Sequence, residues 1–175
     1  MRAVAMSVTR RRLLKVALGA GGAVVAGGAG LLGLRGSAPQ VRGLNVLSDQ
    51  QYRTMSALAT ALIPEGGPFE LGAQDVDLAR AFDGYLTDEP KWAQDEAKTA
   101  LTLLEYGPLV FERRLATFSN LPADERLAHY ATWATSSLAL RRQVAVGFRK
   151  FLSLVFYDSP AVWPNLRYEG PLIKE

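Results

Sequence analysis

Apolar residues recur every three or four positions through most of the chain after residue 47, and this spacing restricts the body to helices. The first such segment spans residues 49–63, and its apolar positions are Tyr52, Met55, Leu58, Leu62 and Ile63. Ser48 precedes it and Gln51 follows three residues later, which is the pattern of a capping box at a helix start. Pro64 then ends the helix because proline cannot donate the next backbone hydrogen bond.

The same spacing predicts further helices along the body. They cover residues 75–86, 91–104, 110–118, 121–136 and 137–157. Residues 65–74 contain three glycines and one proline and are expected to form a loop, and no segment alternates in the way of a strand. The sequence therefore predicts an all-α fold, a compact bundle of about five to six helices. An irregular tail, rich in aromatic residues and proline, follows Asp158-Ser159-Pro160.

A basic cluster precedes this body, at residues 9–15 (TRRRLLK). It resembles the bacterial twin-arginine export motif, in which Ser or Thr precedes two arginines, a variable residue, an apolar residue, Leu and often Lys. The matching positions are Thr9, Arg10, Arg11, Leu13, Leu14 and Lys15, with Leu13 standing where Phe is commoner. Such an arginine pair is an address read by a receptor. We therefore expect export to the periplasm by the twin-arginine machinery.

An uncharged apolar run follows over residues 16–34 and is long enough to span a bilayer. Seven of its 19 residues are glycine, which weakens a helix, so the run suits the core of a signal peptide better than a permanent span. A simple membrane anchor, or an uncleaved signal that attaches the protein to the inner membrane, stays open, because Pro39 follows the small residues 36–38. The predicted organisation is a signal at 1–38, a linker at 39–47 and a helical domain at 48–175.

The net charge of +3 arises entirely from the leader. Residues 1–42 hold seven basic residues and no acidic one, whereas the remaining 133 residues carry 13 basic and 17 acidic side chains, a net charge of −4. An acidic body has no electrostatic attraction for phosphates, which argues against nucleic acid as a partner. The chain has no cysteine, which excludes disulfides, thiolate metal sites and c-type haem attachment.

The body shows no pattern of catalytic or metal-binding residues. His129 is the single histidine and lies four residues after Glu125, whereas a di-iron bundle needs Glu-x-x-His on two helices. We expect His129 at a helix surface or interface. The acidic pairs at 95–96 and 124–125 are expected to cap helices or face solvent. The sequence predicts no catalytic residue, no metal site and no cofactor in this chain.

The ordered motifs of the body resemble the gluconate 2-dehydrogenase subunit 3 family, the small (gamma) subunits of gluconate 2-dehydrogenase-type complexes. The motifs are Ala61-Leu62-Ile63-Pro64, Gly72-Ala73, Phe118-Ser119-Asn120-Leu121 with Arg126, Trp133 to Ser136 with Arg141 or Arg142, Phe156-Tyr157, Pro160, Trp163 and Tyr168-Glu169-Gly170-Pro171. They span residues 48–171 in order. Arg167 stands where family members often have glycine.

The resemblance implies a subunit without a catalytic centre that binds a large FAD-containing subunit of the glucose-methanol-choline type. That partner has no signal of its own and is exported on the small subunit's signal, and a cytochrome c subunit commonly accepts the electrons. The candidate interface residues are Trp133, Tyr157, Trp163, Tyr168, Gly170 and Pro171. Alternatively, the tail aromatics cover the open end of the bundle. A stand-alone exported helical binding protein and a small enzyme are the competing functions.

Overall fold

The computed structural model describes residues 40–67 and 70–170, and every regular element in these ranges is a helix. The elements are α3 (Asp49–Leu62), α4 (Leu78–Thr87), α5 (Lys91–Glu105), α6 (Gly107–Glu112), the 3₁₀-helix η2 (Phe118–Asn120), α7 (Ala123–Ala134), α8 (Ala139–Asp158) and α9 (Trp163–Leu166). The predicted all-α fold is confirmed. The export motif from Thr9 to Lys15 and the candidate Pro171 lie outside the described residues.

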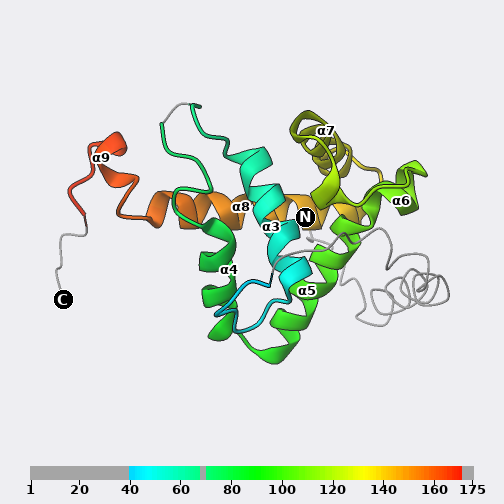
Figure 1. The fold of residues 1–175 in the computed structure, drawn as a ribbon, viewed down its shortest axis with the longest axis horizontal. Coiled ribbons are helices and arrows are strands. Elements are labelled where there is room, and N and C mark those ends of the chain that lie inside the picture. The colour runs from blue at the N-terminus through cyan, green and yellow to red at the C-terminus, as the bar shows by residue number, and fades with distance from the viewer. Residues whose placement is uncertain (1–39, 68–69, 171–175) are drawn as a thin grey trace, which may run out of the picture. The chain divides into compact units, whose positions relative to one another are not determined.

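Helix α3 is the centre of the bundle and contacts α4, α5, α7 and η2 (Figure 1). The predicted capping box is present: the Gln51 N–H donates to Ser48 Oγ at 3.3 Å, and the Ser48 N–H donates to Gln51 Oε1 at 3.0 Å. These two bonds satisfy backbone donors that a helix start otherwise leaves open. The helix ends at Leu62, just before the predicted boundary at Ile63 and Pro64.

Helix α4 begins three residues later than the spacing predicts, because two acids bind the preceding turn. Asp75 Oδ2 accepts the N–H of Gly72 at 2.7 Å, and Asp77 Oδ1 accepts the N–H of Arg80 at 3.1 Å. Asp77 is therefore the N-cap of the helix, with φ of 41°. Short acidic side chains favour such capping positions over the helix interior.

The helix predicted over residues 110–118 is wrong in its second half, because Arg113 ends α6 with φ of 55° and Phe118 begins the separate 3₁₀-helix η2. Helix α6 begins at Gly107, directly after α5, although the Gly-Pro pair was expected to be a break. Pro108 lies in the first turn of α6, where its missing N–H leaves no bond unmade. The tail also contains a helix, α9, where irregular structure was expected. Arg167 ends α9 with φ of 54°.

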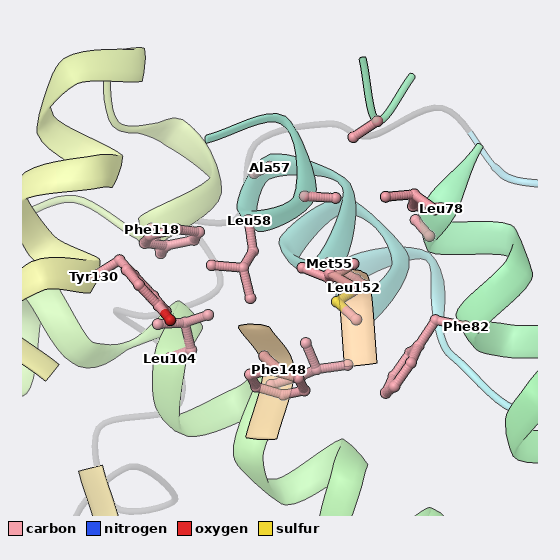
Figure 2. Packing of buried hydrophobic residues seen from close by; sticks show 14 of the residues in the cluster. Met55, Ala57, Leu58, Leu78, Phe82, Leu104, Phe118, Tyr130, Phe148 and Leu152 are labelled. Carbon is pink, nitrogen blue, oxygen red and sulfur yellow. The ribbon is translucent and has the colours of Figure 1, made fainter. Parts of the chain in front are cut away.

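The core lies between α3 and the helices around it, as Figure 2 shows. Met55 and Leu58 of α3 are fully buried and face Phe118 of η2 and Leu152 of α8, which are also buried. Helix α8 packs against α7 and α4 and crosses behind α3 in Figure 1. The Tyr130 hydroxyl donates to the Ala145 carbonyl at 2.9 Å, which links α7 to α8 inside the core.

The segment predicted as a linker is bound to the bundle along most of its described length. The buried carboxylate of Asp83 accepts the N–H groups of Asn45, Val46 and Leu47 at 2.7, 3.0 and 2.7 Å. The Val41 N–H donates to Asp49 Oδ1 at 3.1 Å. Residues 41–47 therefore belong to the folded unit, and any free linker ends before Val41.

The chain divides into two units, Met1–Ser37 and Ala38–Glu175, and all described residues lie in the second. Within residues 40–67 and 70–170, no helix combines the length and apolar character needed to cross a membrane.

Candidate partner-binding surface

Four of the six candidate interface residues lie together at the C-terminal end of α8. The indole N–H of Trp163 donates to the Tyr157 carbonyl at 3.2 Å, and the rings of Trp163 and Tyr168 meet edge to face with centroids 5.3 Å apart. A Cβ at Gly170 would lie 3.1 Å from Cζ3 of Trp163, so glycine lets the backbone pass close to this ring. Tyr157 and Tyr168 are about half exposed, at 49% and 48%.

The tail is attached to the bundle rather than free. Val162 is fully buried in the core, and Phe156 of α8 is 2% exposed. The tail therefore covers part of the bundle and presents Tyr157 and Tyr168 to solvent at the same time. The packing of Phe156 agrees with the alternative that the tail covers the bundle, whereas contact of Tyr157 and Tyr168 with a partner stays a prediction.

Trp133, by contrast, is a core residue. It is 1% exposed, and its ring lies against Phe111, with centroids 5.8 Å apart, and against His129, with centroids 5.9 Å apart. The guanidinium of Arg141 lies 5.2 Å from the Trp133 ring and 4.6 Å from the Phe111 ring. Its position one helical turn after the buried Tyr130 turns Trp133 inward, so it offers no surface to a partner.

Of the two positions expected for His129, a helix surface or a helix interface, the structure shows the interface between α7 and α6. His129 is 2% exposed, and its Nδ1 lies 2.6 Å from Oε1 of Glu112. Because a carboxylate can only accept, Nδ1 carries the proton of the neutral ring. Nε2 finds no hydrogen-bonding partner among the described residues and faces Gly107, where a Cβ would lie 2.7 Å away.

This packing explains the electrostatics of His129. Burial lowers the pKa of His129 below its usual 6.5, although the hydrogen bond to Glu112 acts in the opposite direction. Protonation would place a second N–H, on Nε2, against Gly107 with no acceptor. The His129–Glu112 pair is therefore closed to a ligand at Nε2 and joins α7 to α6.

Two further buried acids were not singled out from the sequence, Asp83 and Glu105. Glu105 accepts hydrogen bonds from Gln50 Nε2 at 2.6 Å, from Thr54 Oγ1 at 2.9 Å and from Ser119 Oγ at 2.7 Å. Both acids occupy core positions of their helices, one residue after the buried Phe82 and Leu104. An acid within an apolar stripe is the signal that could have revealed them.

Of the acidic pairs expected to cap helices or face solvent, residues 124–125 lie in the first turn of α7 and residues 95–96 in the second turn of α5. Glu125 forms an ion pair with Arg114, and Asp95 pairs with Lys91 at 3.2 Å. Over the described ranges, no three His, Cys, Asp or Glu side chains come close enough to hold a metal ion.

A groove of about 280 Å³ separates the end of α3 from the C-terminal half of α8. It is lined by Leu62, Ile63, Pro64, Leu71, Arg149, Leu152, Ser153, Phe156 and Tyr157. We call it the α3–α8 groove. Most of its lining is apolar, and it brings together the Ile63-Pro64 and Phe156-Tyr157 motifs, which are far apart in the sequence.

A second hollow, of about 270 Å³, lies between α3 and the start of α4. Tyr52, Gln74 and Asp77 make its lining more polar. The Tyr52 hydroxyl donates to Asp77 Oδ1 at 2.9 Å, so the polar groups of this hollow already bind one another.

The side of α8 opposite the core carries basic and apolar residues together. Arg142, Val146, Lys150, Leu154 and Tyr157 recur at helical spacing and are all exposed. We call this set the α8 outer face. Leu154 is 67% exposed and Val146 is 46% exposed, which is unusual for apolar side chains on one helix stripe.

Fold and surface together define the class of protein as an all-α bundle whose conspicuous features are two buried, hydrogen-bonded acids, Asp83 and Glu105, and an exposed, partly apolar helix face. Comparisons with protein-family models, with curated proteins and with solved structures find no match to this chain.

Proposed function

We propose that this chain is the non-catalytic small subunit of an exported FAD-dependent dehydrogenase of the glucose-methanol-choline type, acting on a sugar, alcohol or acid. The chain would assemble with the large flavin subunit in the cytoplasm and supply the twin-arginine signal on which the folded pair is exported. The FAD would lie in the partner, and a cytochrome c subunit would accept the electrons.

The observation that carries this proposal is the order of the sequence motifs. A twin-arginine pair, Arg10-Arg11, precedes the apolar run, and the motifs that resemble the gluconate 2-dehydrogenase subunit 3 family follow in sequence from Ala61 to Pro171. The twin-arginine route carries proteins that fold before they cross the membrane, which suits a subunit exported together with a flavoprotein.

The contacts of several motif positions also support the proposal. A Cβ at Gly72 would lie 2.6 Å from the backbone nitrogen of Glu65, so the loop after Pro64 requires glycine there. Gly170 has φ of 103° and packs beneath Trp163. These positions therefore have structural reasons for their residue types, as expected if the motifs describe one fold.

The proposal is tested by co-purification. The full chain is expressed with a C-terminal tag beside the large flavoprotein reading frame expected next to its gene, and the tagged material is recovered from the periplasm. We expect a yellow complex of the two subunits that reduces an artificial electron acceptor. A colourless monomer would contradict the proposal and favour the stand-alone binding protein.

The export role has its own test. Arg10→Lys combined with Arg11→Lys should leave the assembled flavoprotein in the cytoplasm, because the receptor reads the arginine pair. Arg12→Lys is the matched control, since Arg12 occupies the variable position of the motif. Periplasmic dehydrogenase activity that is unchanged in the double variant would refute export of the partner on this signal.

A further inference from the structure

We propose that the flavin subunit binds this chain through an acidic segment that lies along the α8 outer face and places one apolar side chain in the α3–α8 groove. The identity of the partner rests on the proposed function, whereas the position and chemistry of the interface rest on the features below.

The first feature is the distribution of charge. No acidic residue occurs between Glu125 and Asp158, and this stretch of 32 residues contains five basic ones. The chain after residue 42 has a net charge of −4, so the basic stretch stands out against an acidic body. Such segregation favours association with a surface of opposite charge and speeds the encounter.

The second feature is that these charges are not neutralised within the folded unit. In the described part of the chain, no carboxylate oxygen lies within 4.0 Å of Arg142, Arg149 or Lys150. Arg142 donates to a backbone carbonyl, that of Ser136. Arg141 differs, because its guanidinium lies over the rings of Phe111 and Trp133. The outward charges are therefore available to carboxylates of another molecule.

The third feature is the apolar surface between the charges. Leu154 and Val146 alternate with Lys150 along one stripe, and Tyr157 ends the stripe at the rim of the groove. Aromatic residues and arginine are enriched at protein interfaces, and Tyr157 and Arg142 supply both on this stripe. Large exposed apolar patches on soluble proteins mark interaction sites, and a partner that covers this stripe would bury Val146, Leu154 and Tyr157 together.

The groove identifies the kind of partner. Its volume of about 280 Å³ is at the lower end for small-molecule sites, which span about 300–1,000 Å³. It suits one anchoring side chain, and Arg149 at its edge suits a carboxylate next to that anchor. A lipid surface has no single side chain that would fill a discrete apolar groove. A protein segment that combines acidic residues with an apolar anchor fits both the basic α8 outer face and the α3–α8 groove.

The test measures the affinity of the full-length chain for the purified flavin subunit by mass photometry. Arg149→Glu combined with Lys150→Glu should raise the Kd at least about tenfold at low salt, because two attractions become repulsions. Wild-type affinity should fall when ionic strength rises from about 0.05 to 0.5 M, and the variant should lack this dependence. Lys91→Glu with Lys98→Glu on α5 is the matched control and should bind like wild type.

A second variant examines the apolar part. Leu154→Ser should weaken binding about tenfold without affecting the thermal unfolding of the chain, because Leu154 is 67% exposed. Leu115→Ser is its control, since Leu115 is 82% exposed and belongs to the segment between α6 and η2 rather than to α8.

The possible results separate the inference from the proposed function. If the wild-type chain does not bind the flavin subunit, the proposed function fails. If the wild-type chain binds and the α8 variants bind equally well, the inference is overturned while the proposed function stands. The α8 variants could instead keep the flavin subunit but lose binding to anionic phospholipid vesicles, and this result would assign the face to a lipid surface. If they keep the flavin subunit but lose self-association, the face binds a second copy of the chain. Either result would overturn the inference.

Discussion

The carboxylate of Asp83 in α4 accepts the backbone N–H of Leu47 at 2.7 Å, across 36 residues of sequence. The same carboxylate also binds Asn45 and Val46, so one buried side chain holds the segment through which the chain enters the folded unit. Hydrogen bonds to a charged acceptor are stronger than those between neutral groups. A buried carboxylate requires them because it has lost its contacts with water.

Replacement of Asp83 should release that entry segment. Asp83→Asn places an NH₂ donor among three backbone donors, and we expect the free energy of unfolding to fall by about 2–4 kcal/mol. Cleavage by trypsin after Arg42 should become faster, because residues 41–47 lose their attachment. Chemical denaturation and timed proteolysis measure the two effects. Asp88→Asn at the exposed end of α4 is the control, and an equal loss in both variants would contradict the role of Asp83.

The buried His129 should make stability depend on pH. Its pKa in the folded state lies below the usual 6.5, so the unfolded chain takes up the proton first as pH falls. The free energy of unfolding should therefore keep its full value above about pH 6.5. At lower pH it should decrease, by up to about 1.4 kcal/mol per pH unit. In His129→Asn this component should vanish. Denaturant titrations between about pH 7.5 and 5.5 measure it, and equal slopes in both proteins would contradict the assignment.

Two glycines on different helices should respond in opposite directions to alanine. At Gly107 a Cβ would lie 2.7 Å from Nε2 of His129 and 3.0 Å from Cζ2 of Trp133, so Gly107→Ala should cost about 1–3 kcal/mol. At Gly84 no atom lies within 4 Å of the added Cβ, and Gly84→Ala should stabilise α4 by up to about 1 kcal/mol. Thermal melts distinguish the two, and a tolerated alanine at position 107 would argue against tight packing around His129.

Arg167 ends α9 in the left-handed conformation that glycine adopts without strain. Arg167→Gly should therefore stabilise the chain by about 0.5–1 kcal/mol. Asn165→Gly, in the same helix at a residue with ordinary backbone angles, is the control and should give no gain. Denaturation midpoints compare the variants, and a loss of stability in Arg167→Gly would show that the side chain contributes more than the strain costs.

The local signals of the sequence predicted local structure well. The Ser48–Gln51 capping box and the start of α5 at Lys91 lie where the sequence places them, because caps and helical spacing depend only on neighbouring residues. The packing partners were not predictable. Trp133 lies one turn from the buried Tyr130, but nothing within α7 shows that α6 and α8 are the helices that pack against Trp133 and His129.

The candidate surface was predicted only in part, because some of its residues are neighbours in the sequence and others are not. Tyr157, Trp163, Tyr168 and Gly170 are close in sequence, and their association follows from the turn around Pro160 and the short α9. The α3–α8 groove joins residues about 90 positions apart, such as Pro64 and Tyr157, and only the tertiary arrangement shows it.

The attachment of residues 41–47 has a consequence for the fate of the proposed signal. Only residues 39 and 40 separate its expected end at Ala38 from Val41, whose N–H is bound by Asp49. A signal peptidase reads an extended substrate on both sides of the bond it cuts, so the folded unit competes with the peptidase for the same few residues. Removal of the signal would then be timed by how often this segment detaches from α3 and α4, and a firmly held segment would keep the signal on the mature protein.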